Sequence, residues 1–343
     1  MGLKILTGWP LEDQQTGLYV ISALKAMGHL VTNVDPKVIY RAAMLSGKEV
    51  EPLVYAAMEA AVHKSRPDAI FISRQGWFTR FAKAYKNKIP VGGWNVDVRY
   101  DPEGEWSSLL ELIGTCSHWF TIAAGNVPWY RENVNPSTHW LSEGCEPIVH
   151  TPPNDNELKV ANNNHMVDTF RAPDVTFAGS ISTSHTGPPR VELLRALDKE
   201  FSLRVYGAHN NTYLVNKDHS MMAYCSSINL GHSGWPNVSL SQSARDYRVM
   251  AAGGFLLTNS VRHYDEFFID GVHFDRYTTI EDCIDKIKYY NNNPNVKQAI
   301  ANAGYLETHH NHTFTHRLSR AISIMSGGDD FHDGQYEEWS KRE

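Results

Sequence analysis

Residues 174–180, DVTFAGS, and residues 190–207, RVELLRALDKEFSLRVYG, decide the fold of this chain. Short apolar runs at 175–178 and 203–206 are typical of buried strands. Between them, leucines recur at helical spacing over residues 190–201, which predicts a helix with one apolar face. A strand, a helix and a second strand in this order predict a βαβ unit with parallel strands.

The same alternation of strand and helix extends in both directions from this stretch. Further strands are expected at 4–7, 30–34, 69–73, 89–94, 119–123, 228–230 and 255–258. Further helices are expected from Thr16 to Met27 and at 51–63, 77–85, 106–113, 239–251, 280–290, 296–308 and 317–325. Repeated β-α-β order predicts parallel sheets that are covered by helices on both faces.

The length of 343 residues, 42% of them hydrophobic, favours two domains of roughly 150 residues each. We therefore predict an α/β fold of two Rossmann-like, doubly wound domains that face each other across a cleft, where such sheets bind ligands. The expected parts are an N-terminal domain (1–150), a polar linker (151–173), a C-terminal domain (174–325) and an acidic tail (326–343).

Composition excludes several other classes of protein. No run of about 18 apolar residues is present, so no membrane-spanning helix is expected, and the N-terminus lacks the cleavage pattern of a signal peptide. The four cysteines form no C-x-x-C pair, which favours a reducing, cytoplasmic location. Six acidic and two basic residues at 327–343 carry −4 of the net charge of −6. This tail either packs on the N-terminal domain through Phe331, Tyr336 and Trp339 or is disordered.

Several motifs, taken in order, resemble the CgeB-like (spore-maturation-protein type) glycosyltransferases, a GT-B family. The motifs lie at 174–180, 190–194, 203–207, 239–259, 264–268, 270–271, 302–304 and 312–317, with weaker matches at 94–97 and 140–147. The resemblance implies metal-independent transfer of a sugar from a nucleotide sugar, UDP-linked by expectation, which the C-terminal domain would hold. Two alternatives stay open: a nucleotide-sugar epimerase or hydrolase, and a catalytically silent nucleotide-binding module.

The residues of the C-terminal domain fit such a donor site. Gly179 and Ser180 follow a strand without bulky side chains, so their backbone N–H groups could approach a diphosphate. Ser239 is expected near the start of a helix whose dipole favours phosphate, or simply as its cap, and Arg245 could bind phosphate through two hydrogen bonds. Tyr206 and Gly207 end a strand where a base would stack.

One residue departs from the family pattern, in which a glutamate contacts the ribose of the donor. Arg248 occupies the position of that glutamate, and an arginine cannot accept hydrogen bonds from hydroxyl groups. Asp246 could replace the glutamate, the donor could be held differently, or donor binding could be lost. Our hypothesis is that Arg248 contacts a phosphate or a sugar carboxylate.

Asp97 is the candidate catalytic base, because it follows a strand of the N-terminal domain near its carboxyl end. An inverting transfer needs a base for the acceptor hydroxyl, whereas a retaining transfer does not. A loop or helix-capping role before Asp101 is the alternative. No metal site is expected, since the chain has no D-x-D triplet and the adjacent histidines at 309–312 do not share one helix face.

Residues 74–99 contain six basic residues and one acidic residue, with aromatic residues between them. This composition suits a polyanionic acceptor, and hydroxymethylated pyrimidines in phage DNA are one candidate. The candidate contacts are Arg74, Trp77, Arg80 and Arg99. The alternative is an amphipathic helix with Phe78, Phe81 and Tyr85 in the core and its lysines in solvent.

Overall fold

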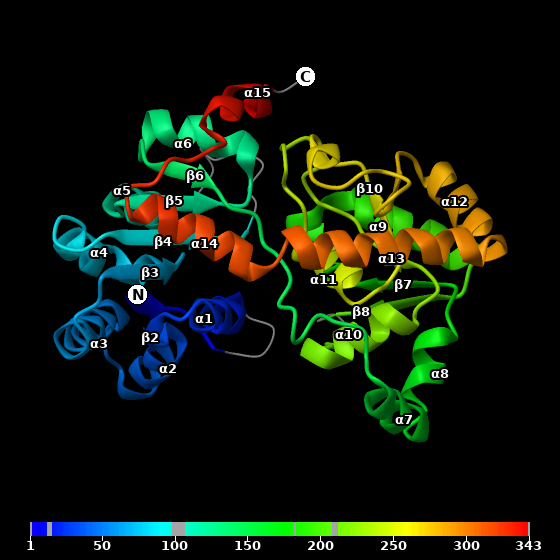
Figure 1. Ribbon diagram of the computed structural model, residues 1–343, viewed down its shortest axis with the longest axis horizontal. Helices are drawn as coiled ribbons and strands as arrows, with labels where there is room; N and C mark the ends of the chain where they lie inside the picture. Colours follow the sequence, from blue (N-terminus) through cyan, green and yellow to red (C-terminus); the bar gives the residue numbers. More distant parts are fainter. Residues whose placement is uncertain (1, 12–15, 98–106, 182, 208–211, 342–343) are drawn as a thin grey trace. The chain divides into compact units, whose positions relative to one another are not determined.

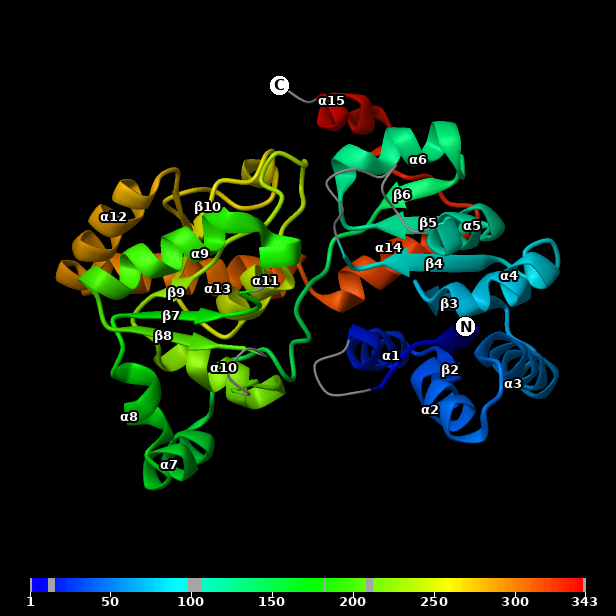
Figure 2. The same ribbon diagram turned by 180° about the vertical axis from the view of Figure 1, so that it is seen from behind.

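The computed structural model describes residues 2–11, 16–97, 107–181, 183–207 and 212–341, with the backbone alone over 183–188. The chain forms two units, one of Met1–Ser142 with Phe314–Glu343 and one of Glu143–Thr313. Figures 1 and 2 show a sheet with covering helices in each unit. The two units are described separately below.

The first unit contains a six-stranded parallel sheet in the order β2-β1-β3-β4-β5-β6. Its strands are β1 (Lys4–Gly8), β2 (Leu30–Asn33), β3 (Ala69–Ser73), β4 (Val91–Asn95), β5 (His118–Thr121) and β6 (Thr138–Trp140). Its helices are α1 (Thr16–Ala26), α2 (Pro36–Ser46), α3 (Val50–Ser65), α4 (Thr79–Tyr85), α5 (Ser107–Thr115), α6 (Val127–Asn133), α14 (Phe314–Met325) and α15 (Tyr336–Ser340). Strands β3 and β4 are buried along their whole length, as apolar runs in a doubly covered sheet should be.

The second unit contains a five-stranded parallel sheet in the order β11-β10-β9-β7-β8. Its strands are β7 (Val175–Ala178), β8 (Leu203–Tyr206), β9 (Asn229–Leu230), β10 (Leu256–Asn259) and β11 (Asp275–Tyr277). Its helices are α7 (Asp155–Asn163), α8 (Met166–Arg171), α9 (Thr183–Glu200), α10 (Asn216–Cys225), α11 (Ala244–Ala251), α12 (Ile280–Asn292) and α13 (Pro294–Asn311). Helix α13 lies in front of the sheet in Figure 1 and α9 in Figure 2, so both faces are covered.

The strand order reverses once in each sheet, and this reversal determines where a ligand fits. In the second unit the chain goes from β7 outward to β8 and returns to β9 on the other side of β7. Strands that diverge in this way leave room outside their carboxyl ends, and open α/β sheets bind ligands at this switch point. The carboxyl ends of β7 and β9 therefore mark the place to look for a site.

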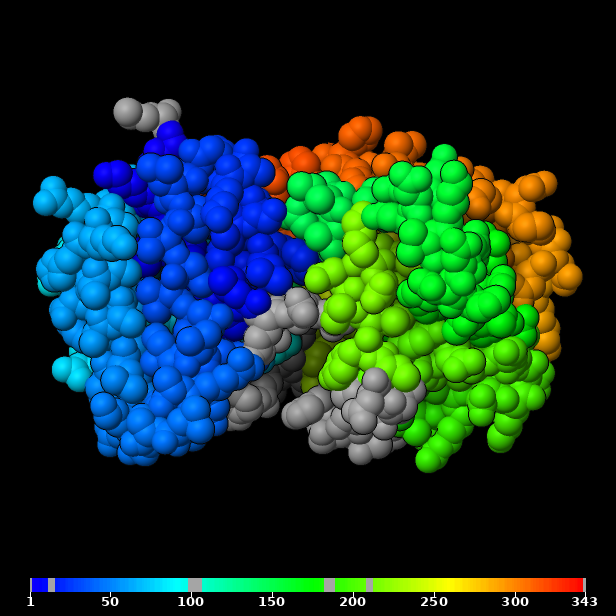
Figure 3. All heavy atoms as spheres, turned by 90° about the horizontal axis from the view of Figure 1, so that it is seen from below, coloured from blue at the N-terminus to red at the C-terminus, as the bar shows by residue number. Residues whose placement is uncertain are grey.

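The unit boundaries differ from the predicted domains. Residues 155–171 of the expected linker form α7 and α8, and Ala161, Val167 and Phe170 are buried in the core of the second unit. The sequence hides these helices because α7 is polar on most of its surface, although Asn154 and Glu157 form a capping box at its start. The helices α7, α8 and α10 form a surface of the second unit that is drawn in greens in Figure 3.

The end of the chain belongs to the first unit. Phe314, which begins α14, lies 5.4 Å from Tyr19 and 6.2 Å from Trp94 between ring centroids, so α14 packs against α1 and the sheet. Of the tail residues expected to pack, Tyr336 and Trp339 are buried, whereas the side chain of Phe331 is 72% exposed. The packed arrangement of the tail is therefore the one observed.

Candidate functional site

Two arginine side chains converge at the switch point of the second unit. Arg190 comes from α9 and Arg245 from the first turn of α11, which Ser243 caps. Their guanidinium carbons lie 5.6 Å and 4.6 Å from the ring centroid of Phe177 on β7. Two cations against one aromatic ring concentrate positive charge at the carboxyl end of this strand.

The guanidinium of Arg245 lies directly against Gly179. A Cβ atom at position 179 would come within 2.2 Å of Arg245 Nη2, so no other residue allows this approach without a shift. Arg245 Nε donates a hydrogen bond to the carbonyl oxygen of Ala178. Its Nη1 is buried and has no hydrogen-bond partner among the described residues. That N–H group is available to an anion.

Arg190 is 5% exposed and is held by backbone carbonyl groups. Its Nη1 donates to Ser180 O at 2.8 Å, and its Nη2 donates to His232 O. Burial, together with the charge of Arg245, lowers the pKa of Arg190 to about 9, so Arg190 remains a cation at neutral pH. In the sequence, Arg190 stands out only as the start of an expected helix and of a family motif. The signal that could have selected it is its position in the first motif after a strand that ends in glycine.

Two other side chains near the start of α11 have buried polar atoms that form no hydrogen bond with any described residue. Asp246 is 1% exposed and neither of its carboxyl oxygens has a hydrogen-bond partner there, and the same holds for both polar atoms of the Gln242 amide. Burial raises the pKa of Asp246 to about 7, although Arg245 and Arg190 act to lower it. Buried polar groups are almost always satisfied, by protein, ordered water or ligand.

The two histidines near the arginines are neutral at physiological pH. Burial and the charges of Arg190 and Arg245 lower the pKa of His232 to about 4. Burial and the charges of Arg248 and Arg245 lower the pKa of His219 to about 3. Neither imidazole therefore adds positive charge near pH 7, and the arginines alone supply it.

The structure brings together part of the predicted donor set. Gly179, Ser180 and Arg245 meet at the end of β7, and Arg248 follows on α11, near His150 and His219. The predicted helix from Ser239 is wrong at its start, because α11 begins at Ala244. Residues 239–242 form an irregular segment instead: Leu240 has a φ of 55° and donates its N–H to Arg262 O, while Ser239 Oγ lies 3.0 Å from His263 Nδ1.

Other predicted donor contacts are already satisfied inside the protein. The N–H of Gly179 donates to Tyr206 O at 2.8 Å, so it does not point to a phosphate. The N–H of Gly207 faces Thr212 Oγ1 at 3.4 Å. The ring of Tyr206 is buried against Phe170, with 5.9 Å between centroids, and base stacking on this ring is not what the structure shows. The tyrosine ring is not available to a base because it packs among apolar side chains of the core of the second unit.

In the first unit, the structure places Asp97 after β4, with its side chain 57% exposed and paired with Arg74. Trp77 stacks on Tyr40 at 5.1 Å, and Arg80 lies 4.8 Å above the ring of Tyr55. Arg99 and Asp101 lie outside the described residues. The rings of Phe78, Phe81 and Tyr85 are buried. This is the arrangement that the alternative, an amphipathic helix with its aromatic residues in the core, predicts.

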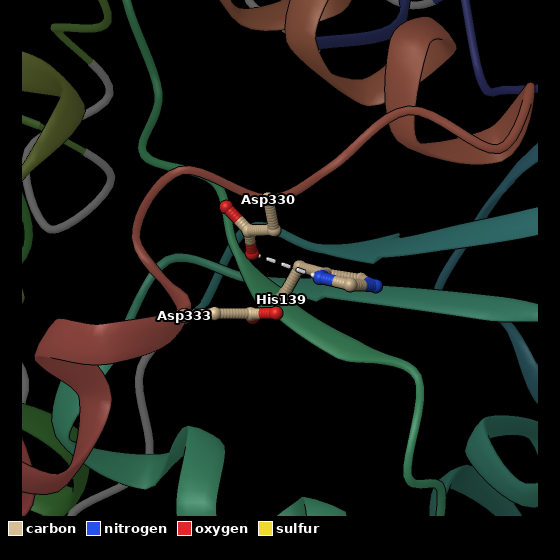
Figure 4. Close-up of side chains that lie close together, drawn as sticks. All are labelled: His139, Asp330 and Asp333. Carbon is tan, nitrogen blue, oxygen red and sulfur yellow. Dashed lines mark hydrogen bonds and ion pairs between the residues drawn. The ribbon is translucent and has the colours of Figure 1, made fainter.

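One group of side chains in the first unit has the composition of a metal site. His139, Asp330 and Asp333 place ligand atoms within 4.8 Å of one another (Figure 4). Asp330 already accepts hydrogen bonds from His139 Nδ1 at 2.9 Å, from Tyr336 Oη at 2.6 Å and from Arg320. Asp333 pairs with Arg131. Both carboxylates are thus already bound by side chains of the protein. These contacts hold the tail, which contains Asp330 and Asp333, against the rest of the first unit.

Residues 190–323 match a protein family described as glycosyl transferase-like. HepE from Anabaena, solved in complex with UDP-glucose, is similar over 95% of this chain and 100% of that chain, with a TM-score of 0.67 and 11% identity. A glycosyltransferase from Rickettsia africae is similar over 95% and 98%, with a TM-score of 0.66 and 13% identity. Sucrose-phosphate synthase from Thermosynechococcus elongatus is similar over 95% and 100%, with a TM-score of 0.63 and 9% identity.

No curated protein matches the sequence. At these identities the solved structures establish the fold, and they confirm the predicted α/β class with two parallel-sheet domains of GT-B type. The matched family segment includes Arg190, Arg245 and Asp246, all of which stand at the switch point. Over the ranges that the structure describes, no helix has both the length and the apolar character to cross a membrane.

Proposed function

We propose that the protein is a glycosyltransferase that takes its sugar from a UDP-sugar, and that Arg190 and Arg245 bind the diphosphate of this donor. The observation that carries the proposal is the pair of buried guanidinium groups at the switch point, one of which has an N–H group that no described residue accepts. The glycosyl transferase-like segment and the UDP-glucose complex of a structural neighbour support the choice of ligand. The motif order supports the CgeB-like subtype.

Calorimetry with UDP and UDP-glucose tests donor binding, with GDP, ADP, CDP and dTDP as competing nucleotides. Arg245→Ala and Arg190→Ala should each weaken UDP binding roughly 10- to 100-fold, because a hydrogen bond to a charged group contributes about 1.5–3 kcal/mol. Arg195→Ala is the matched control, since Arg195 is an exposed arginine on the same helix as Arg190. If none of the nucleotides binds the wild type, or if both site variants bind like the control, the donor site is refuted.

Release of UDP from UDP-glucose separates the remaining activities. A transferase releases UDP in proportion to added acceptor, and a hydrolase releases UDP without an acceptor. An epimerase instead converts the donor into a second UDP-sugar without net release of UDP, which chromatography of the nucleotide sugars detects. A silent module binds the nucleotide and releases no sugar. We propose that the arginines take the place of a metal ion in stabilising the leaving diphosphate. Transfer that persists in excess chelator is the expected result, and its loss would require a metal.

Arg248 keeps its proposed role as a contact to an anionic group of the donor, because it lies one turn beyond Arg245 on the same helix. UDP-glucose and UDP-glucuronate distinguish the two anionic groups. Arg248→Glu should weaken both ligands if Arg248 binds phosphate, and should weaken mainly UDP-glucuronate if it binds the sugar carboxylate. Unchanged affinity for both would refute the contact.

The acceptor remains a prediction. Arg74 is paired with Asp97, and the aromatic residues of 77–85 are packed into the unit, so what supports a DNA acceptor is the basic charge alone. DNA binding that weakens steeply with salt is the test of this alternative. The four cysteines, all free and buried, support a reducing compartment such as the cytoplasm.

A further inference from the structure

The carboxyl group of Asp246 is the most unusual polar group of the second unit. It is 1% exposed, and no described residue donates a hydrogen bond to it. Its Oδ1 faces Gly231 at the end of β9, where an added Cβ would come within 3.2 Å of this oxygen and 2.3 Å of Thr258 Oγ1. A buried carboxylate without hydrogen bonds is costly, so its charge must be balanced by nearby cations.

The groups around Asp246 come from several elements, and only arginines among them are charged near pH 7. Arg245 is its neighbour on α11, and the charge of Arg190 on α9 also acts on it. Tyr264 and Tyr277 also act on its surroundings, but their pKa values are raised well above the usual range, mainly by burial. The two arginines also act on His219 and His232, which are neutral, and Arg248 on α11 acts on Arg245, while Tyr247 acts on Tyr264.

The charges add up differently with and without a donor. The charges that act on Asp246 itself are those of Arg190 and Arg245, whereas Arg248, one turn further along α11, is not among them. Two guanidinium groups and one carboxylate leave these surroundings of Asp246 with one net positive charge when no donor is bound. The diphosphate of a nucleotide sugar carries two negative charges, so the same groups would then be left with one excess negative charge in a poorly solvated place. A proton on the carboxyl group restores neutrality, and a like charge nearby always favours that protonated form.

We propose, on the basis of the proposed function, that Asp246 is a positioning residue that holds Arg190 and Arg245 as their counter-ion in the empty site and takes up one proton from solvent when the donor's diphosphate binds to them. The proton comes from bulk water or buffer and no covalent bond to the donor changes. Donor binding is then linked to pH. Well below the pKa of Asp246, which burial raises to about 7, the carboxyl group is already protonated and affinity is constant. Well above that pKa the Kd rises up to tenfold per pH unit.

Calorimetry with UDP-glucose is the test, because both of its phosphates are esterified and neither titrates near neutral pH. Titrations in two buffers of different ionisation enthalpy give the number of protons taken up. For the wild type we expect close to one proton at pH 8 and close to none at pH 6. The Kd should rise roughly 30-fold between pH 6 and pH 8.5.

Asp246→Asn keeps the shape of the side chain and removes its charge, so it mimics the protonated acid. We expect this variant to take up no proton, to bind UDP-glucose with the same Kd at every pH, and to bind about tenfold more tightly than the wild type at pH 8. Asp285→Asn, which changes an exposed carboxylate on α12, should keep the wild-type profile. His219→Gln and His232→Gln should retain proton uptake, which assigns the proton to Asp246.

The opposite results are equally specific. If Asp246→Asn binds more weakly than the wild type at every pH, Asp246 accepts hydrogen bonds from the donor and the counter-ion role is wrong. If Asp246→Asn fails to fold, the wild-type proton count still decides, because binding at pH 8 without proton uptake overturns the proposal. Failure of the wild type to bind UDP-glucose or UDP at any pH refutes the proposed function itself. Binding without proton uptake refutes only the role of Asp246.

Discussion

Replacing Gly179 by alanine adds one methyl group at the point where the structure has least room for it. The new carbon would lie 2.2 Å from Arg245 Nη2, 3.2 Å from Arg245 Cζ and 3.2 Å from Phe177 Cε1. Because the Phe177 ring belongs to a buried strand, the arginine is the group that moves. Its guanidinium would leave both the ring and the carbonyl of Ala178.

The expected loss follows from the contacts that the guanidinium gives up. A buried cation–π contact contributes about 2 kcal/mol and a charged hydrogen bond about 1.5–3 kcal/mol, part of which a displaced arginine regains in water. Its contact with the diphosphate is lost in addition. We therefore expect Gly179→Ala to raise the Kd for UDP by roughly 10- to 100-fold. Overall stability should fall by about 1–3 kcal/mol, as for other overpacked positions.

A double-mutant cycle in the UDP-binding assay isolates the cause. If Gly179 matters only because it admits Arg245, Gly179→Ala should have almost no further effect once Arg245→Ala is present. Gly114→Ala is the control, because a Cβ there meets nothing closer than 3.6 Å. The reasoning is refuted if Gly179→Ala binds UDP like the wild type, or if its effect persists undiminished in the Arg245→Ala background.

Four further predictions concern the first unit. Asp330→Asn should lower the free energy of unfolding by about 3 kcal/mol, because it leaves Arg320 without its buried partner; urea unfolding measures this, with exposed Asp329→Asn as the control. Burial acts to raise the pKa of Asp330, but hydrogen bonds from His139 and Tyr336 and the charge of Arg320 hold it below the usual range. The stability that Asp330 contributes should thus be complete above pH 4 and be lost as the pH falls further, which melting temperatures at stepwise lower pH would show. Trp94→Phe should cost about 1–3 kcal/mol, because the indole N–H donates to Leu141 O at 3.0 Å and its loss leaves this buried carbonyl unpaired; a stability equal to that of the wild type would contradict this. Asp97→Asn should reduce the turnover of an inverting transferase about 100-fold or more and leave its Kd for UDP unchanged, whereas intact turnover would exclude Asp97 as the base.

The alternation of apolar runs predicted both parallel sheets, because strands that are covered on both faces are apolar throughout. The helices that were not predicted are those whose sequences lack an apolar stripe on the buried face. Helix α2 buries only Pro36 and Ala43, and what defines it is its caps, Asp35 at the start and Gly47 in the left-handed conformation at the end. Helix α10 has little amphipathic character, and its buried residues include Ser220 and Cys225. In such helices tertiary packing decides the outcome.

The candidate site was predictable only in part, for a similar reason. Arg245 could be selected from its place in a motif, but the role of Gly179 depends on an arginine 66 positions later in the chain. The motif suggested a glycine whose N–H binds phosphate. In the fold this N–H donates to Tyr206 O on β8. Gly179 matters instead because it has no side chain, which leaves room for the guanidinium of Arg245. Arg190 and Gln242 were not chosen because their burial is a property of the assembled unit.

The path of the chain through the two units has a consequence for the order in which they form on the ribosome. The second unit is one continuous segment whose ends are held together, since Cys145 N–H donates to His312 O and an isolated parallel β-bridge joins Cys145 to Thr313. The first unit lacks α14 and the tail until residues 314–343 have left the exit tunnel. The half of the protein that is synthesised first is therefore the half that is completed last. Until then the rings of Tyr19 and Trp94 lack the packing partner that Phe314 provides.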